Sequence, residues 1–118
     1  MWDRYNLMGQ NAMSQGRAGD AETQFRLAVK KKKKFDAKDP RLPSSLNNLA
    51  NCLRSQGKFP EAETHYKRAL EVKQKAVGAF HTDLISIYEN YAKMLRAAGR
   101  ESEAGKMDQH ARAIFMKK

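Results

Sequence analysis

Residues 46–70 read LNNLANCLRSQGKFPEAETHYKRAL, and this stretch decides the fold. Its first half carries large apolar residues at helical spacing. Gly57 follows, and glycine adopts the left-handed conformation at a helix C-terminus without a Cβ penalty. Pro60 suits the first turn of the next helix, where a backbone N–H has no helical partner. The pattern predicts two helices folded back on each other, and alanines are expected where the backbones approach, at Ala50, Ala62 and Ala69.

The same unit occurs three times along the chain. Ala62 has counterparts at Ala21 and Ala104, which gives a period of 41 and then 42 residues. Further positions repeat in the same register: Gly16, Gly57 and Gly99; Gly9, Ala50 and Ala92; Ala28, Ala69 and Ala111; Phe25 and Tyr66. A fixed period of this length is typical of a solenoid, in which each unit stacks on its neighbour.

This unit resembles the tetratricopeptide repeat. The first helix has the order large–x–x–large–small, and the second has alanine, an aromatic residue and alanine again. The likeness is carried by residues 46–50, 56–59, 62–63 and 66–70. The usual repeat has about 34 residues, so this period adds roughly two helical turns. It is similar to the longer repeats of kinesin light chains and nephrocystin-like proteins.

The resemblance implies an all-α fold, an α-solenoid that winds as a right-handed superhelix of three helix-turn-helix repeats with six antiparallel helices. One domain is expected over residues 1–118, with repeats at approximately 2–40, 43–81 and 85–118. The expected helices span residues 3–16, 20–35, 44–56 and 60–77, then a fifth that ends at Gly99 and a sixth over 101–116. Residues 36–43 are expected to be a linker, because the residue before each of its two prolines is disfavoured in a helix. Thr82 or Asp83 is expected to cap the fifth helix.

Composition favours an exposed helical binding protein. The formal net charge is +10, and each third of the chain carries more basic than acidic residues. Such a field attracts acidic partners. The single cysteine excludes an intrachain disulfide, and no run of about 18 apolar residues indicates a transmembrane segment. The N-terminus lacks the pattern of a signal peptide, so a cytoplasmic location is expected.

Catalysis is not indicated. The histidines at positions 65, 81 and 110 match no metal-binding spacing, and no nucleophile elbow or phosphate-binding glycine loop occurs. We expect Cys52 to be a buried, inert thiol and His81 to hydrogen-bond locally. The sequence therefore predicts no enzyme, no cofactor and no metal site.

A ligand groove follows from the resemblance, since the first helices of successive repeats line a concave surface in this family. The residues expected to face it are Asn6, Leu7, Gln10 and Met13 in the first repeat, Asn47, Asn48, Asn51 and Arg54 in the second, and Glu89, Asn90, Lys93 and Arg96 in the third. Asparagine amides can pair with a peptide backbone whatever its side chains. The arginine fork suits carboxylates, so an extended acidic peptide is the expected ligand. The alternative is that these residues merely fill a wet surface.

One familiar variant of the family does not fit. Co-chaperone domains clamp a partner's C-terminal carboxylate with lysines, asparagines and an arginine in these helices. Asn48 matches that pattern, whereas the other four positions hold Asn6, Gln10, Ser86 and Asn90. Both lysines and the arginine are missing, so a receptor for a chaperone tail is not indicated.

Two other functions stay open. Lys30, Lys31, Lys32, Lys33 and Lys34 form a basic run that suits nucleic acid or an anionic surface, although it also suits the solvated C-terminal end of a helix. No aromatic residues interleave with it as a platform for single-stranded nucleic acid would require. The terminal helices are a second possibility, because Ala113, Phe115 or Met116 could be exposed and mediate self-association.

Overall fold

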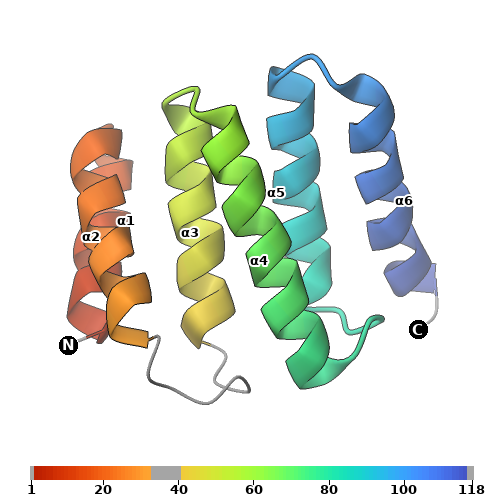
Figure 1. Cartoon of the computed structure of the whole chain (residues 1–118), viewed down its shortest axis with the longest axis horizontal. Helices are drawn as coiled ribbons and strands as arrows, with labels where there is room; N and C mark the ends of the chain where they lie inside the picture. Colours follow the sequence, from red (N-terminus) through yellow and green to blue (C-terminus); the bar gives the residue numbers. More distant parts are fainter. Residues whose placement is uncertain (1, 33–40, 117–118) are drawn as a thin grey trace.

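The structure, a computed structural model, describes residues 2–32 and 41–116. Six helices follow one another over these residues: α1 (Trp2–Ser14), α2 (Ala18–Lys32), α3 (Arg41–Ser55), α4 (Phe59–Val77), α5 (Leu84–Ala97) and α6 (Glu101–Met116). No strand occurs within the described part. The helices pack as three consecutive pairs, α1 with α2, α3 with α4 and α5 with α6, arranged in chain order (Figure 1). The predicted all-α solenoid of three helix pairs is confirmed.

The turn inside each pair is built in the same way. Gly16, Gly57 and Gly99 have positive φ angles of 73°, 77° and 79°. The N–H of the residue after each glycine donates to a carbonyl five residues earlier, as in Lys58 to Leu53. This is the Schellman arrangement, which closes the last turn of a helix. The glycine periodicity of the sequence therefore marks the turn that reverses each pair.

Close packing inside the first pair depends on Gly9. A Cβ atom at Gly9 would lie 2.6 Å from Cε1 of Phe25. The repeat-equivalent residues Ala50 and Ala92 are fully buried. In the first repeat this position is glycine because the Phe25 ring of the second helix occupies the space that a side chain would need.

Helices α2 and α3 begin earlier than predicted, and Asp83 does not cap α5 through its side chain. Helix α3 begins at Arg41, so Pro43 lies inside its first turn and Leu42 is helical. Proline is tolerated there because its missing N–H has no helical acceptor. Helix α2 also begins earlier than expected, at Ala18. Asp83 precedes α5 without a side-chain capping hydrogen bond, and its carboxylate pairs with Lys73. The linker was expected over 36–43, and its residues 41–43 are helical instead. Residues 36–40 and the predicted end of the second helix lie outside the described residues.

An ionic contact recurs at the two junctions between pairs. At the first junction Glu22 of α2 accepts hydrogen bonds from Gln56 Nε2 at 2.8 Å and Lys58 Nζ at 3.1 Å. At the second junction Glu63 of α4 accepts two from Arg100, both at 2.9 Å. Glu22 and Glu63 are equivalent in repeat register, and so are Lys58 and Arg100. We call this recurring contact the junction clasp.

The clasp lowers the pKa of both glutamates. Burial raises the pKa of Glu22, but hydrogen bonds from Gln56, Arg26 and Lys58 outweigh that effect and lower it to about 2. At the second junction hydrogen bonds from Arg100 lower the pKa of Glu63 against the opposing effect of burial. Both side chains are largely buried, with exposed fractions of 15% and 17%. Each junction therefore holds a charged carboxylate that depends on cations for its stability.

Candidate peptide-binding face

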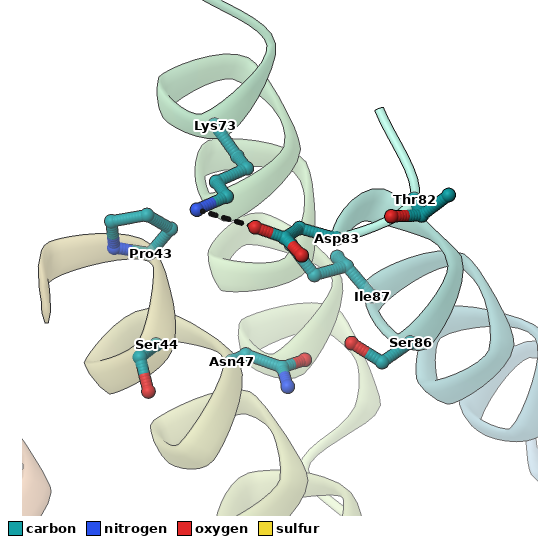
Figure 2. Close-up of a pocket in the computed structure, with 8 residues that line it drawn as sticks. All are labelled: Pro43, Ser44, Asn47, Lys73, Thr82, Asp83, Ser86 and Ile87. Carbon is teal, nitrogen blue, oxygen red and sulfur yellow. Dashed lines mark ion pairs between the residues drawn. The ribbon is translucent and has the colours of Figure 1, made fainter. Parts of the chain in front are cut away.

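Three pockets lie along the surface formed by α1, α3 and α5. The first, of about 200 Å³, is lined by Gln10, Met13, Phe25, Asn48 and Asn51. The second, of about 340 Å³, is lined by Pro43, Ser44, Asn47, Lys73, Thr82, Asp83, Ser86 and Ile87 (Figure 2). The third, of about 320 Å³, is lined by Ser86, Glu89, Asn90, Lys93, Arg96 and Asp108. Nine of the twelve predicted groove residues line one of these pockets, and Asn6 and Arg54 contact residues that do. Leu7 lines none of the three and is exposed.

Asparagine amides connect the three repeats across this surface. Asn48 Nδ2 donates to Asn6 Oδ1 at 3.1 Å, and Asn90 Nδ2 donates to Asn47 Oδ1 at 3.4 Å. The donors are equivalent in repeat register, and so are the acceptors. We call this pair of hydrogen bonds the amide row, and the surface of α1, α3 and α5 around it the amide face. The predicted asparagines are therefore neighbours that bond one another across repeats.

The two predicted arginines already have partners within the protein. Arg54 Nη1 donates to the backbone carbonyl of Asn90 at 3.3 Å. Arg96 forms ion pairs with Asp108 and with Glu101, the latter at 3.1 Å. Although these arginines are equivalent in sequence, one ties α3 to α5 and the other ties α5 to α6.

Asp108 changes the chemistry of the third pocket. It stands where the first two repeats have Phe25 and Tyr66. Tyr66 is buried and its hydroxyl donates to Asn51 Oδ1, whereas Asp108 is partly exposed and holds Arg96. The aromatic periodicity, which stops after Tyr66, is the sequence signal for this difference. Lys93, which is exposed, lies in the same pocket.

The second pocket contains residues that the sequence analysis missed. In Figure 2, Ser44, Asn47 and Ser86 surround the opening, and Lys73 of α4 reaches Asp83 before α5. The Lys73 Nζ to Asp83 Oδ2 distance is 3.2 Å, and only 12% of the Lys73 side chain is exposed. Ser44 and Ser86 are one repeat apart, so the period could have identified them. Nothing in the period indicated Lys73.

The structure describes the first part of the basic run. Lys30 is exposed at the end of α2. Helix α2 continues through Lys31 and Lys32, and Lys33 and Lys34 lie outside the described residues.

The histidines and the cysteine behave as structural residues. The backbone N–H of Asp83 donates to His81 Nδ1 at 3.0 Å, which confirms a local role for His81. His110 stacks on Tyr88 with ring centroids 5.2 Å apart. Burial lowers the pKa of His65. Cys52 is fully buried, and burial followed by the nearby Glu22 charge raises its pKa to about 11.

Within residues 2–32 and 41–116, no three histidine, cysteine, aspartate or glutamate side chains gather in a way that could hold a metal ion. None of the helices over the same ranges has both the length and the apolar character needed to cross a bilayer.

Comparison with known proteins places the chain in a family. The family profile described as tetratricopeptide repeat matches residues 41–117. The chain belongs to the tetratricopeptide repeat (TPR) family. Repeats of this family generally mediate protein–protein interaction, and the fold is generally a non-catalytic scaffold. No curated protein sequence matches the chain.

Solved structures support the same assignment. BtubC (BKLC) from P. vanneervenii superposes with a TM-score of 0.92 at 25% identity, covering 99% of this TPR chain and 46% of that one. TPR-like repeats of a protein from Podosopora anserina, assigned as a kinesin light chain, give 0.86 at 20% identity, covering 98% and 55%. The TPR domain of Arabidopsis FLU gives 0.84 at 20% identity, covering 99% and 96%. The chain thus spans about half the length of the first two.

Proposed function

We propose that this TPR chain is a non-catalytic protein-interaction module that binds an extended, acidic peptide segment along the amide face. The observation that carries the proposal is the row of three pockets on α1, α3 and α5. Polar groups predominate in the second and third pockets, whereas Met13 and Phe25 make the first pocket more apolar. Ser86 lines both the second and the third pocket, so these two adjoin. A peptide that passes from one pocket to the next would contact equivalent side chains once per repeat.

The amides supply contacts to a peptide backbone. Asn48 and Asn90 each donate through Nδ2 within the amide row. An amide nitrogen carries two hydrogens, and the described residues provide a single acceptor for each of these two nitrogens. The second hydrogen is therefore available to a ligand carbonyl. Such contacts recognise an extended backbone without regard to its side chains.

Lys93 supplies the preference for acidic side chains. It is exposed in the third pocket, and none of the ion pairs among the described residues includes it. Arg96 lies in the same pocket but already holds Asp108 and Glu101, so a ligand carboxylate has to compete for it. We therefore assign the first ionic contact to Lys93. The net charge of +10 steers acidic partners toward the protein.

The test is peptide binding measured by fluorescence anisotropy over a salt series. The probes are an extended peptide with four glutamates and the same peptide with glutamines. We expect the acidic peptide to bind more tightly, and Lys93→Glu to weaken it at least about tenfold. Lys106→Glu is the matched control, because Lys106 is exposed on α6 and the change in net charge is identical. Equal effects of the two substitutions would contradict the groove assignment.

The amides need a separate variant. Asn48→Ala with Asn90→Ala should weaken the glutamate and glutamine peptides by the same factor, because backbone contacts are lost for both. A duplex oligonucleotide serves as the competing ligand. Binding of the duplex alone, lost when Lys30, Lys31, Lys32, Lys33 and Lys34 are replaced by glutamine, would assign function to the basic run instead. We also propose that the protein is cytoplasmic and meets its partner there.

A further inference from the structure

Each junction between repeats joins two complementary surfaces. The earlier repeat presents the outer side of its second helix, which we call the forward face. It consists of a glutamate, an aromatic residue three positions later and an aliphatic residue seven positions later: Glu22, Phe25 and Val29 in α2, and Glu63, Tyr66 and Leu70 in α4. The aromatic and aliphatic residues are buried. At both junctions the glutamate carries the clasp.

The later repeat presents what we call the rear face. It combines two large residues of its first helix with the cation that follows its turn: Leu46, Leu49 and Lys58 at the first junction, and Tyr88, Tyr91 and Arg100 at the second. Tyr91 stacks on Tyr66 with centroids 5.7 Å apart and donates to Glu63 at 2.7 Å. All four large residues are at most 7% exposed.

The first repeat has the rear-face residues at the same positions, and two of the three are exposed while Tyr5 is partly buried. These residues are Tyr5, Met8 and Arg17. Met8 is 42% exposed, whereas its equivalents Leu49 and Tyr91 are 1% and 4% exposed. The Arg17 side chain is 59% exposed.

Arg17 is held in the geometry that the clasp uses. It pairs with Asp20 at 3.0 Å, just as Arg100 pairs with the equivalent Glu103 at 2.6 Å. Arg100 binds Glu103 and Glu63 at the same time, so the local acid does not prevent the clasp. Asp20 takes only the Nε of Arg17, while Nη1 donates to Gln15 Oε1 at 3.1 Å on the exposed surface. A second carboxylate would therefore accept from Nη2 and displace the neutral Gln15 from Nη1.

The forward face of the third repeat has been replaced by other chemistry. Glycine stands at the glutamate position, aspartate at the aromatic position and arginine at the aliphatic position: Gly105, Asp108 and Arg112. No acid stands at the clasp position, Asp108 already pairs with Arg96, and charged residues replace the apolar pair. A second unchanged copy of this chain therefore offers the rear face of the first repeat no matching surface.

We propose that the rear face of α1 and its turn bind a helix of a partner that carries the forward-face pattern, a glutamate followed by an aromatic residue at the third position and an aliphatic residue at the seventh. The partner's glutamate joins Arg17 as Glu63 joins Arg100. This surface is distinct from the amide face and independent of the peptide proposed there. The outer face of α6 does not bind a repeat in this register.

The test converts the chain itself into the partner. The triple variant Gly105→Glu, Asp108→Tyr and Arg112→Leu restores the forward face on α6. A Cβ at Gly105 meets nothing within 4 Å, so the added side chain has room. Sedimentation equilibrium over a concentration series should show a monomeric parent chain and a variant whose mass grows with concentration, because heterologous contacts do not close. Adding Arg17→Glu to the variant should return it to a monomer.

Each other outcome overturns the proposal. If the triple variant keeps its helical circular dichroism but stays monomeric, the rear face is not a binding surface. The same conclusion follows if the variant associates and Arg17→Glu does not reverse it. If the parent chain itself associates and Arg17→Glu abolishes that association, the statement that the outer face of α6 binds no repeat in this register is wrong. Should the triple variant fail to fold, the double variant Gly105→Glu with Arg112→Leu keeps the Asp108–Arg96 pair and is tested for binding to the immobilised parent chain. Its matched control is Ser102→Glu with Arg112→Leu, and equal binding by the two, including none by either, overturns the proposal.

Discussion

Arg100 joins the third repeat to the second, because both terminal nitrogens of its guanidinium donate hydrogen bonds to Glu63. Nη1 donates to Oε1 and Nη2 donates to Oε2, each at 2.9 Å. The same guanidinium also binds Glu103, and Tyr91 donates to the Glu63 carboxylate from the side. Paired donors to a mostly buried carboxylate are among the stronger polar contacts in proteins. The equivalent contact at the first junction uses a lysine, which has no such fork.

Removing the two hydrogen bonds from Arg100 to Glu63 should destabilise the fold. We expect Arg100→Ala to lower the free energy of unfolding, since the charged and largely buried carboxylate of Glu63 loses its main hydrogen-bond donor. Arg100→Lys should lose less, because Lys58 performs the equivalent role at the first junction. Urea unfolding followed by circular dichroism measures both. Arg112→Ala, at an exposed arginine of α6, is the control, and a loss as large as that of Arg100→Ala would contradict the assignment.

Acid should weaken the first junction over a defined range. The pKa of Glu22 in the folded chain is about 2, below its ordinary value of 4.5. A depressed folded-state pKa means that the unfolded chain takes up protons first. The stabilisation is complete above about pH 4.5 and is lost progressively as the pH falls toward 2. Urea midpoints measured from pH 6 to pH 2.5 should therefore fall, and Glu22→Gln should flatten that slope. Glu71→Gln, at an exposed ion pair, should leave the slope unchanged; a parallel decline in all three proteins would refute the prediction.

Gly9 should tolerate no larger residue. A Cβ atom there would approach three atoms of the Phe25 ring at 2.6 to 2.8 Å, so Gly9→Ala should destabilise by about 1–3 kcal/mol through overpacking. Gly19→Ala is the matched control, because a Cβ there meets nothing within 4 Å and alanine favours a helix. Thermal unfolding should show opposite signs for the two. Combining Gly9→Ala with Phe25→Leu should recover part of the loss, and no recovery would mean that the clash is not with this ring.

Cys52 should be protected from reagents in the native state. The Cys52 side chain is 0% exposed. Burial raises the pKa of its thiol to about 11, so little of the reactive thiolate forms at pH 8. Its thiol also donates to the Ala18 carbonyl at 2.9 Å. Reaction with a disulfide reagent at pH 8 should therefore be slower by a factor on the order of 10² or more than in urea. Comparable rates in the two conditions would show that the junction opens readily.

Much of the fold follows from local rules that the repeat displays three times. The glycines at the turns and the alanines at the helix contacts were predictable because each has one steric reason. Helix α6 has the bounds expected for it, 101–116, since Gly99 closes the preceding turn and the apolar spacing continues to Met116. The exposed ends were also predicted: Ala113 is exposed, Phe115 is 67% exposed and Met116 is 75% exposed.

The partners of charged side chains were not predictable. Arg54 and Arg96 occupy the same register, yet one donates to a backbone carbonyl and the other binds Asp108. That difference depends on which residue lies opposite on another helix. The junction clasp was missed for the same reason: Glu22 and Lys58 are 36 residues apart, and no local pattern joins an acid in one repeat to a base in the next.

The amide row also gives the amide face a direction. In both of its hydrogen bonds the later repeat is the donor and the earlier repeat is the acceptor. The side-chain dipoles therefore align along the row, and the face differs when approached from α1 or from α5. An extended peptide has its own sequence of carbonyls and N–H groups, so reversing it exchanges donors for acceptors against this row. A peptide that binds there should run in one orientation only, and a reversed-sequence peptide should lose affinity although its charge and composition are the same.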